Sequence, residues 1–211
     1  MPIMSYFDRI AYTWDDNPVR VELAHAVTNA VMADIPLSAD MRCLDFGCGT
    51  GLVSMRMAER VSSVVAVDTS SQMIAALERK CSEAGLKSIQ PYRIETELDI
   101  PCYHRYNLVV SSMVLHHIPH LLPLIKRFYS CMADGAWLAV ADLEKEDGSF
   151  HQGMDGIAHF GFRTSELSQL IEYAGLKVVQ SRTVYTVRKP AENGEMKEYP
   201  VFLLVARRQQ A

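Results

Sequence analysis

Three glycines separated by single residues are the strongest chemical signal in this sequence of 211 residues. They stand at Gly47, Gly49 and Gly51, directly after an apolar run that is predicted to be a buried strand. A backbone without Cβ atoms can adopt positive φ angles and lie directly against a ligand. A dinucleotide turn would need its last glycine one residue later, where the chain has Leu52. The spacing therefore indicates a ligand other than a nicotinamide dinucleotide.

Two aspartates accompany this glycine turn. Asp45 precedes it, close enough to orient the turn or to accept a hydrogen bond from an amino group, and Asp68 ends the next apolar run. A carboxylate at the end of a strand can accept hydrogen bonds from both hydroxyls of a ribose, whereas it repels a phosphate. The alternative is an ordinary tight turn beside an acid that only caps a helix. That alternative requires the turn, its spacing and the acid to coincide by accident.

Four of the histidines further along the chain are candidates for proton transfer, because an imidazole is the natural acceptor for a proton near neutral pH. His116 and His117 follow a predicted strand, where they either act on a substrate or cap the helix expected from Pro119. His151 and His159 belong to a glycine-rich stretch and are candidates for substrate contact or proton removal. These histidines lack a recognised ligand spacing, so no metal site is expected.

Alternating strands and helices are predicted to position these side chains. Five apolar runs predict strands at residues 42–46, 63–67, 88–94, 106–111 and 136–141. Helices are expected at about residues 19–33, 52–60, 70–84, 119–132 and 164–174. Residues 178–188 and 198–207 alternate enough to pair as an antiparallel hairpin. The order predicts an α/β fold with a doubly wound, mostly parallel sheet, in which ligands bind beyond the carboxyl ends of the strands.

The glycine turn, together with Asp45 and Asp68, resembles the class I S-adenosylmethionine-dependent methyltransferase family over about residues 40–208. The resemblance implies a Rossmann-like, three-layer α/β/α fold around a seven-stranded sheet with the antiparallel C-terminal hairpin. It also implies S-adenosylmethionine as cofactor, S-adenosylhomocysteine as product, and in-line transfer of a methyl group. S-adenosylmethionine offers an amino acid, a ribose diol and an adenine, but no phosphate, which suits a carboxylate at position 68.

The resemblance further implies which residues surround the cofactor. The turn and the strand before it would contact the amino acid part through Asp45, Phe46, Gly47, Cys48, Gly49 and Gly51. Residues on the next two strand ends would contact the ribose and the adenine, namely Asp68, Thr69, Met73, Thr96, Glu97 and Leu98. Ser111 and Met113 would line the methyl-donor end, and His116, His151 and His159 are the candidate catalytic residues.

The length of the chain and its apolar content of 49% fit one domain over residues 1–211 better than two. Within it we expect an N-terminal helical cap at 1–36 and a cofactor-binding core at 37–141. An acceptor-side loop at 142–163 and a helix with the closing hairpin at 164–211 would follow. Aromatic residues in the cap and in the loop are either packing residues or parts of a lid.

Composition argues against several classes of partner. Twenty-one basic residues stand against 25 acidic ones, so the electrostatic footprint of a nucleic-acid-binding protein is missing. The sequence Ser111-Ser112-Met113-Val114 also differs from the Asn/Asp-Pro-Pro-Tyr of enzymes that methylate amide or exocyclic nitrogens. Five cysteines without a Cys-x-x-Cys pair predict reduced thiols in a cytoplasmic protein rather than disulfides or zinc. No apolar run reaches membrane-spanning length.

The leading hypothesis is a small-molecule methyltransferase that is a monomer or a homodimer and binds neither nucleic acid nor membrane. A second hypothesis keeps the fold without catalysis, as a cofactor-binding or regulatory subunit whose acceptor pocket is closed. Methylation of a protein also stays open, because an isoelectric point near 6.0 excludes few protein substrates. A nicotinamide oxidoreductase is disfavoured by Leu52.

Overall fold

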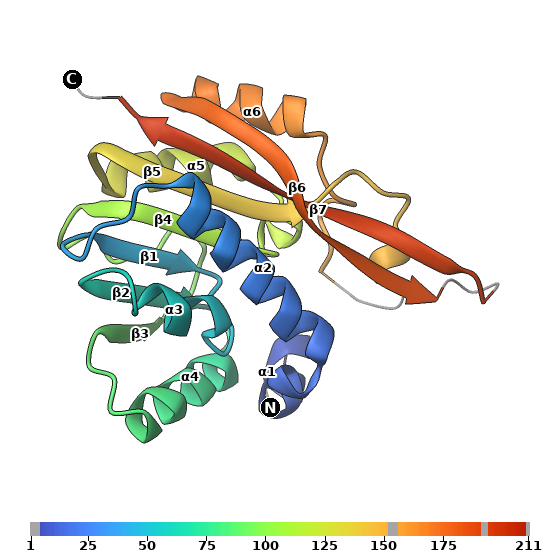
Figure 1. The fold of residues 1–211 in the computed structure, drawn as a ribbon, viewed down its shortest axis with the longest axis horizontal. Helices are drawn as coiled ribbons and strands as arrows, with labels where there is room; N and C mark the ends of the chain where they lie inside the picture. The colour runs from blue at the N-terminus through green and yellow to red at the C-terminus, as the bar shows by residue number, and fades with distance from the viewer. Residues whose placement is uncertain (1–4, 152–155, 191–193, 210–211) are drawn as a thin grey trace.

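The computed structural model describes residues 5–151, 156–190 and 194–209, which form one seven-stranded sheet with helices on both sides (Figure 1). The strand order is β3-β2-β1-β4-β5-β7-β6. The strands are β1 Arg42–Phe46, β2 Ser63–Asp68, β3 Ile89–Arg93, β4 Tyr106–Ser112, β5 Met132–Leu143, β6 Leu176–Pro190 and β7 Met196–Arg208. The first five run parallel, as the alternation of apolar runs predicts.

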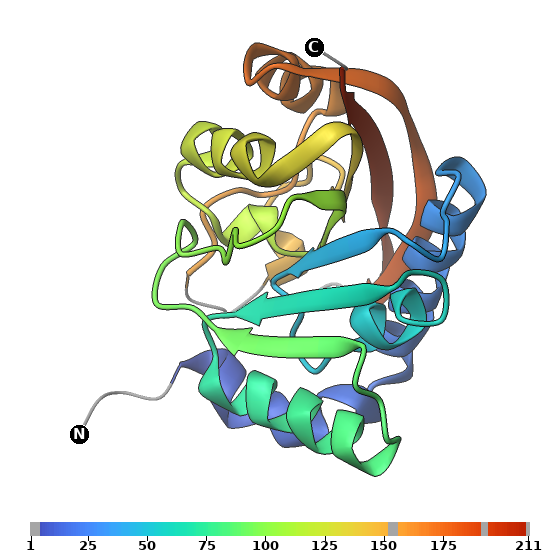
Figure 2. The same cartoon turned by 90° about the vertical axis from the view of Figure 1, so that its left-hand side faces the viewer.

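Helices cover both faces of the sheet (Figure 2). The helices are α1 Tyr6–Ile10, α2 Pro18–Asp34, α3 Leu52–Met57, α4 Ser71–Glu83, α5 Leu121–Cys131 and α6 Thr164–Tyr173, with single 3₁₀ turns η1 Ala11–Asp16, η2 Leu115–His117 and η3 Ser149–His151. One core lies between the sheet and α2, α3 and α4, and the other lies between the sheet and α5 and α6. The predicted three-layer, doubly wound fold is confirmed. None of the helices in the described ranges is long and apolar enough to cross a membrane.

The C-terminal hairpin is longer than its sequence pattern predicts. Strand β7 pairs antiparallel with both β5 and β6, so the reversed strand lies inside the sheet and β6 forms the edge. The hairpin continues past the end of β5 (Figure 1), and its far end holds the chain around residues 147–150. There Tyr199 Oη lies 2.8 Å from Ser149 Oγ, and Lys197 Nζ donates to Asp147 at 2.5 Å.

Helix starts follow local chemistry. Asn17 caps α2 by accepting from the Val19 N–H at 3.0 Å, with Pro18 as the first helical residue. Helix α5 begins later than predicted, at Leu121, because His120 has the non-helical angles φ −119° and ψ 89° and is the N-cap residue. Helix α3 ends at Met57, three residues before its expected end.

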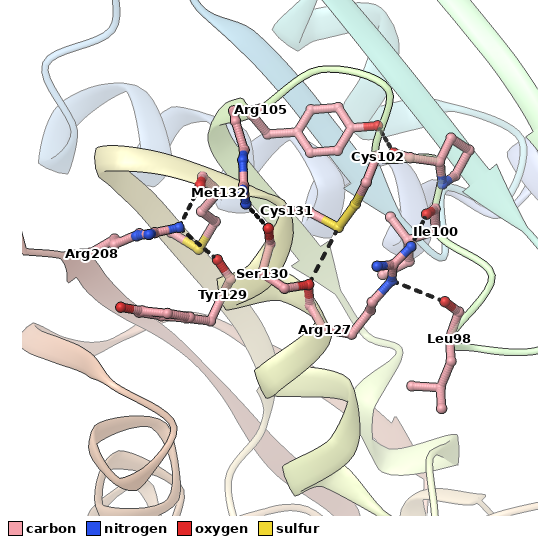
Figure 3. The surroundings of a disulfide bond; sticks show 12 residues. Leu98, Ile100, Cys102, Arg105, Arg127, Tyr129, Ser130, Cys131, Met132 and Arg208 are labelled. Carbon is pink, nitrogen blue, oxygen red and sulfur yellow. Dashed lines mark hydrogen bonds between the residues drawn. A yellow bond between two sulfur atoms is a disulfide. The ribbon is translucent and has the colours of Figure 1, made fainter.

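The prediction that all cysteines are reduced thiols is wrong for two of them. Cys102, in the loop before β4, is bonded to Cys131 at the end of α5, with Cα atoms 5.5 Å apart (Figure 3). Arg127 donates from the same helix to the carbonyl oxygens of Leu98 at 3.1 Å and Ile100 at 2.6 Å. The loop that contains Thr96 to Leu98 is therefore fixed to α5 by one covalent and two polar links. Cys43, Cys48 and Cys81 are free and buried.

Candidate active site

The three glycines of the turn have positive φ angles, but they meet different surroundings. A Cβ at Gly47 would lie 2.3 Å from a methyl carbon of Val114, and one at Gly51 would lie 2.2 Å from Leu77 Cδ1. Both glycines are thus required by packing inside the protein. A Cβ at Gly49 would meet only Met73 Sδ, at 3.9 Å, so this glycine faces open space. Gly49 is the position at which a ligand can approach the backbone.

Asp68 is oriented toward this open space by the backbone. Its Oδ2 accepts from the Gly49 N–H at 2.9 Å, and its Oδ1 accepts from the Ser70 N–H at 2.8 Å. Each carboxylate oxygen keeps a free lone pair, so a diol can still donate to both. Burial raises the pKa of Asp68 above its usual value, and the backbone N–H groups of Ser70, Gly49 and Thr69 oppose that rise. The side chain is pre-oriented and retains capacity for a ligand.

Asp45 is buried beneath the turn. Its exposed fraction is 1%, and Ser54 Oγ donates to its Oδ2 at 2.5 Å. Desolvation by burial raises the pKa of Asp45 to about 7, and the negative charge of Asp68 adds to the increase. In this position Asp45 anchors the first turn of α3 to the end of β1.

The N-terminal segment lies beside the turn and α4. Asp8 accepts from Ser70 Oγ at 2.6 Å and from the Gln72 N–H at 3.2 Å. Asp15 accepts from Thr50 Oγ1 and from Lys80 Nζ, each at 2.5 Å. The sequence analysis did not identify these two aspartates, because their partners lie 35 to 65 residues away in the chain. They attach the segment at both sides of Asp68.

A histidine and an aspartate form a buried pair at the ends of β4 and β5. His116 Nδ1 lies 2.7 Å from Asp142 Oδ1, and the exposed fractions of the two residues are 2% and 0%. Asp142 also accepts from the backbone N–H groups of Leu143 at 2.8 Å and His116 at 3.2 Å. A carboxylate can only accept, so Nδ1 of His116 carries the proton and Nε2 is the available base. The pair has the orientation of a general base and its orienting acid.

His151 stacks against this pair. Its ring centroid is 4.6 Å from that of His116 and 4.7 Å from that of Phe150. The ring is buried, with 5% of its surface exposed, and neither nitrogen has a hydrogen-bond partner in the described ranges. Desolvation, followed by the neighbouring His116, lowers the pKa of His151 to about 3. A neutral, buried and unpartnered imidazole beside a possible base is typical of a site that a substrate completes.

His117 and His159 are engaged in other contacts. His117 Nδ1 lies 3.1 Å from the Gly156 carbonyl oxygen, and its ring packs edge-on against Phe7 at 5.1 Å. Desolvation lowers the pKa of His117 to about 4. His159 Nε2 donates to the Ile118 carbonyl at 2.9 Å, and its backbone N–H donates to the His116 carbonyl at 3.0 Å. These contacts fix the predicted acceptor-side loop to η2, although its residues 152–155 lie outside the described ranges.

The expected adenine side is more open. Met73 is buried beside Gly49, while Thr69 is exposed. Thr96 donates to Asp99 from its backbone at 2.8 Å and from its hydroxyl at 2.9 Å, which closes a compact turn. Glu97 is partly buried, and Leu98 leaves 42% of its surface exposed next to this turn.

The remaining predicted residues lie at the ends of β1 and β4. The Phe46 side chain packs in the core against Phe128 at 5.1 Å, so only its backbone lies at the turn. Cys48 is buried, and its thiol pKa is raised by desolvation. Ser111 Oγ is buried and has no hydrogen-bond partner among the described residues. Met113 has a positive φ of 60° and donates to the Ala141 carbonyl at 2.8 Å.

Within the described ranges, no group of three or more metal-ligating side chains has the arrangement of a metal site. The three clustered histidines are instead involved in ring stacking and pairing with Asp142. Asp142 is the functional candidate whose role the sequence analysis missed. Its position directly after the strand predicted at residues 136–141 was the available signal, although the observed β5 extends to Leu143 and includes it.

Comparisons with known proteins agree with this geometry. The family described as "Methyltransferase domain" matches residues 19–181. An uncharacterized methyltransferase of Schizosaccharomyces pombe is 28% identical over 151 residues, which cover 64% of this chain and 53% of that protein. The trans-aconitate 2-methyltransferase of Rhodococcus jostii is 27% identical over 112 residues, which cover 52% of this chain and 41% of that protein. The chain thus spans about half the length of these curated relatives.

Solved structures share the fold. A S-adenosylmethionine-dependent methyltransferase from Aquifex aeolicus superimposes with a TM-score of 0.69 at 22% identity, covering 91% of this chain and 94% of that one. A Haloferax volcanii complex between the Trm112 methyltransferase activator and a putative methyltransferase contains a chain with a TM-score of 0.80 at 13% identity, with coverage of 99% and 100%. At these identities the likeness concerns the arrangement of the strands and helices.

Proposed function

The chain belongs to the class I S-adenosylmethionine-dependent methyltransferase family, and from this premise we propose that it transfers the methyl group of S-adenosylmethionine to a small-molecule acceptor. The observation that carries the proposal is the contrast within the glycine turn. Gly47 and Gly51 are required by neighbouring side chains, whereas Gly49 faces open space beside the pre-oriented carboxylate of Asp68.

These residues fit the proposed cofactor. A Cβ-free backbone suits the approach of the amino acid part, and two carboxylate oxygens with free lone pairs suit a ribose diol. Among the described residues, no Lys or Arg side chain forms a hydrogen bond or ion pair with Asp68 or the glycine turn, which agrees with a ligand that carries no phosphate. The proposed contacts are the predicted ones, namely Asp45, Phe46, Gly47, Cys48, Gly49, Gly51, Asp68, Thr69, Met73, Thr96, Glu97, Leu98, Ser111 and Met113.

When bound, S-adenosylmethionine supplies an electrophilic methyl carbon. The chain's own residues then have three tasks. The turn and η2 hold the reactants in line, an effect that can contribute about 7 to 11 kcal/mol. His116, oriented by Asp142, accepts a proton from the acceptor where its chemistry requires deprotonation, which is worth about 10²- to 10⁴-fold in rate. The N-terminal segment and the loop after β5 exclude water.

His151 and His159 are proposed to act at the same end of the site. His151 offers two unpartnered ring nitrogens inside a buried environment, so a polar group of the acceptor can complete its hydrogen bonding. His159 uses Nε2 on the Ile118 carbonyl, so it positions η2 and His116 and retains only Nδ1 for an acceptor. A closed, non-catalytic pocket would not need the buried pair of His116 and Asp142.

The names of two relatives support a small-molecule acceptor. Their names describe ubiquinone biosynthesis O-methyltransferases and trans-aconitate 2-methyltransferases, which act on small molecules. A small-molecule acceptor also fits a site whose surroundings come from the N-terminal segment and the loop after β5. Family membership disfavours the nicotinamide oxidoreductase that was considered from the sequence.

Cofactor binding is the first test. Calorimetric titration of the protein with S-adenosylhomocysteine should give a dissociation constant in the micromolar range or lower. Asp68→Asn should weaken binding about 10- to 100-fold, because it removes charge-assisted acceptance from the diol. Asp134→Asn, at an exposed carboxylate paired with Arg208, is the matched control. Absence of heat at high micromolar ligand would contradict the proposal.

Acceptor class is the second test. Labelled S-adenosylmethionine is incubated with the protein and a cell extract divided by ultrafiltration into small molecules and proteins. Label should appear in the small-molecule fraction, and Asp142→Asn should reduce its rate by about 10²-fold or more while S-adenosylhomocysteine affinity stays unchanged. Label in proteins would favour a protein methyltransferase. Cofactor binding without any labelled product would favour a regulatory subunit.

A further inference from the structure

Two partly buried cationic side chains, Arg20 and Lys189, have no carboxylate within ion-pair distance anywhere in the described ranges. At least seven other basic side chains of these ranges form ion pairs, including Arg188, the direct neighbour of Lys189, which lies 2.8 Å from Glu198. Arg56 and Arg127 are also partly buried without a carboxylate, but each donates at least two hydrogen bonds to protein oxygens. Withdrawing a charge from water without a partner is unfavourable, so such groups usually have one. Two of them together need an explanation.

The packing of α2 along β6 brings these cations to the same place. Arg182 pairs with Asp34 at 2.9 Å, and Tyr185 donates to Glu22 at 2.9 Å. As the strand advances, its partners on the helix move toward the helix N-terminus. Continuing this antiparallel arrangement by one step brings Lys189, near the end of β6, toward Arg20 in the first turn of α2, close enough for the two charges to interact. The charge of Arg20 accordingly adds to the desolvation that lowers the pKa of Lys189.

Each cation is held in place through an aromatic ring and a carbonyl oxygen. The Arg20 guanidinium carbon lies 3.8 Å from the Trp14 ring centroid, and its Nη1 donates to the Trp14 carbonyl at 3.4 Å. Lys189 Nζ lies 3.7 Å from the Phe150 ring centroid and donates to the Phe150 carbonyl at 3.1 Å. These contacts orient both side chains. Neither forms an ion pair with a described residue, although the charge of Glu146 acts on Lys189 and partly offsets the desolvation of its ammonium group.

The same aromatic rings connect the cations to the candidate catalytic residues. Phe150 precedes His151, and the two rings lie 4.7 Å apart. Trp14 contacts Phe7 at 5.9 Å, and Phe7 contacts His117 at 5.1 Å. Glu146 is the acid whose charge raises the pKa of Lys189. Its Oε2 accepts hydrogen bonds from the backbone N–H groups of Gly148 at 2.8 Å and Phe150 at 3.1 Å. The two cations therefore border the acceptor end of the site.

We infer that the methyl acceptor carries an acidic group, a carboxylate or a phosphate, and that Arg20 and Lys189 bind it. The inference rests on the proposed function and deepens it. Arg20 supplies a planar pair of N–H donors and Lys189 a point charge, a combination suited to an oxygen anion. His151, buried and without a hydrogen-bond partner in the described ranges, lies between this anion site and His116 and is available to the part of the acceptor nearer the reacting atom.

The test uses the full chain saturated with S-adenosylhomocysteine. Aliphatic di- and tricarboxylates, aromatic monocarboxylates and phosphate monoesters are titrated calorimetrically, each beside its neutral amide, ester or parent alcohol. We expect at least one acid to bind ten times or more tightly than its neutral counterpart. Arg20→Gln and Lys189→Gln should each weaken that acid by about 10- to 100-fold. Lys189→Arg, which keeps the charge, should retain most of the wild-type affinity for the acid. Comparing the carboxylates with the phosphate monoesters identifies the acidic group that the site binds.

Arg188→Gln is the matched control, since Arg188 is exposed, paired with Glu198 and adjacent to Lys189 in sequence. It should leave acid binding unchanged, and all variants should retain the wild-type affinity for S-adenosylhomocysteine. The inference is overturned when no acid is preferred over its neutral counterpart, or when the preference survives both Gln substitutions. Failure of the wild-type protein to bind S-adenosylhomocysteine would instead refute the proposed function, and this outcome is read before any acid is added.

Discussion

Substituting alanine for glycine in the turn should separate packing from ligand contact. A left-handed φ angle destabilises an L-residue by about 1 to 2 kcal/mol. Gly49→Ala and Gly51→Ala share this loss of folding stability, because the two positions have φ angles of 53° and 85°. At Gly51 the new methyl would also overlap the fully buried Leu77, and such overpacking costs about 1 to 3 kcal/mol more. The sums are about 2 to 5 kcal/mol for Gly51→Ala and about 1 to 2 kcal/mol for Gly49→Ala.

Cofactor affinity should show the reverse order. The methyl of Gly49→Ala would occupy the open space beside Asp68, where relieving the overlap with a bound ligand costs about 10- to 100-fold in affinity. Gly85→Ala is the matched control, because Gly85 also has a positive φ, of 64°, with nothing within 4 Å of its added Cβ. Gly85→Ala should lose about 1 to 2 kcal/mol of stability and keep wild-type affinity.

Urea unfolding gives the free energy of unfolding of each variant, and calorimetric titration with S-adenosylhomocysteine gives its affinity. Unchanged affinity in Gly49→Ala would refute the assignment of this glycine to the ligand surface. Equal stability of Gly49→Ala and Gly51→Ala would refute the assignment of Gly51 to packing against Leu77.

Three further predictions concern the disulfide, the buried acid and the N-terminal segment. Reduction, or Cys102→Ser with Cys131→Ser, opens a link across a sequence separation of 29 and should lower stability by about 3 to 4 kcal/mol. That loss corresponds to about 6 to 16 °C in calorimetric Tm, and a change below about 2 °C would contradict the prediction. Burial raises the folded-state pKa of Asp45 to about 7, so the folded state keeps a proton that the unfolded chain releases above pH 3.8. Stability therefore falls as pH rises from about 4 to about 7. The free energy of unfolding of Asp45→Asn relative to wild type should therefore increase across that window, by at most about 1.4 kcal/mol per pH unit, and a flat difference would count against it. The double substitution Asp8→Ala and Asp15→Ala removes the attachments of the N-terminal segment to α4 and the turn. Dissociation of S-adenosylhomocysteine, measured by stopped flow, should then accelerate about tenfold. An unchanged rate would show that the N-terminal segment does not retain the ligand.

Local patterns were sufficient to predict the architecture. Apolar β-branched runs such as residues 63–67 have few alternatives to a buried strand, and the right-handed crossover rule then fixes how successive strands meet. The edge at which the candidate residues gather follows from the same rule, because parallel strands end on one side of the sheet. Asp68 and His116 could be placed there without coordinates.

Contacts between distant segments could not be predicted. The pairing of His116 with Asp142 depends on the register between β4 and β5, in which Ser112 lies opposite Ala141. The disulfide depends on how the loop before β4 lies on α5, which neither cysteine's neighbours reveal. Ion pairs could not be predicted from the sequence either. That Lys189 lacks a carboxylate partner among the described residues can be recognised only when the positions of the acidic side chains are known.

The placement of β7 between β5 and β6 has a consequence for biosynthesis. As the chain leaves the ribosome, β6 emerges with no neighbour, and β5 keeps one flank of unsatisfied backbone groups until residues 196–208 follow. Exposed flanks of this kind recruit other nascent chains or holdase chaperones. Translational pausing before residue 196 should therefore yield a species prone to self-association, and completing the final strand should release it.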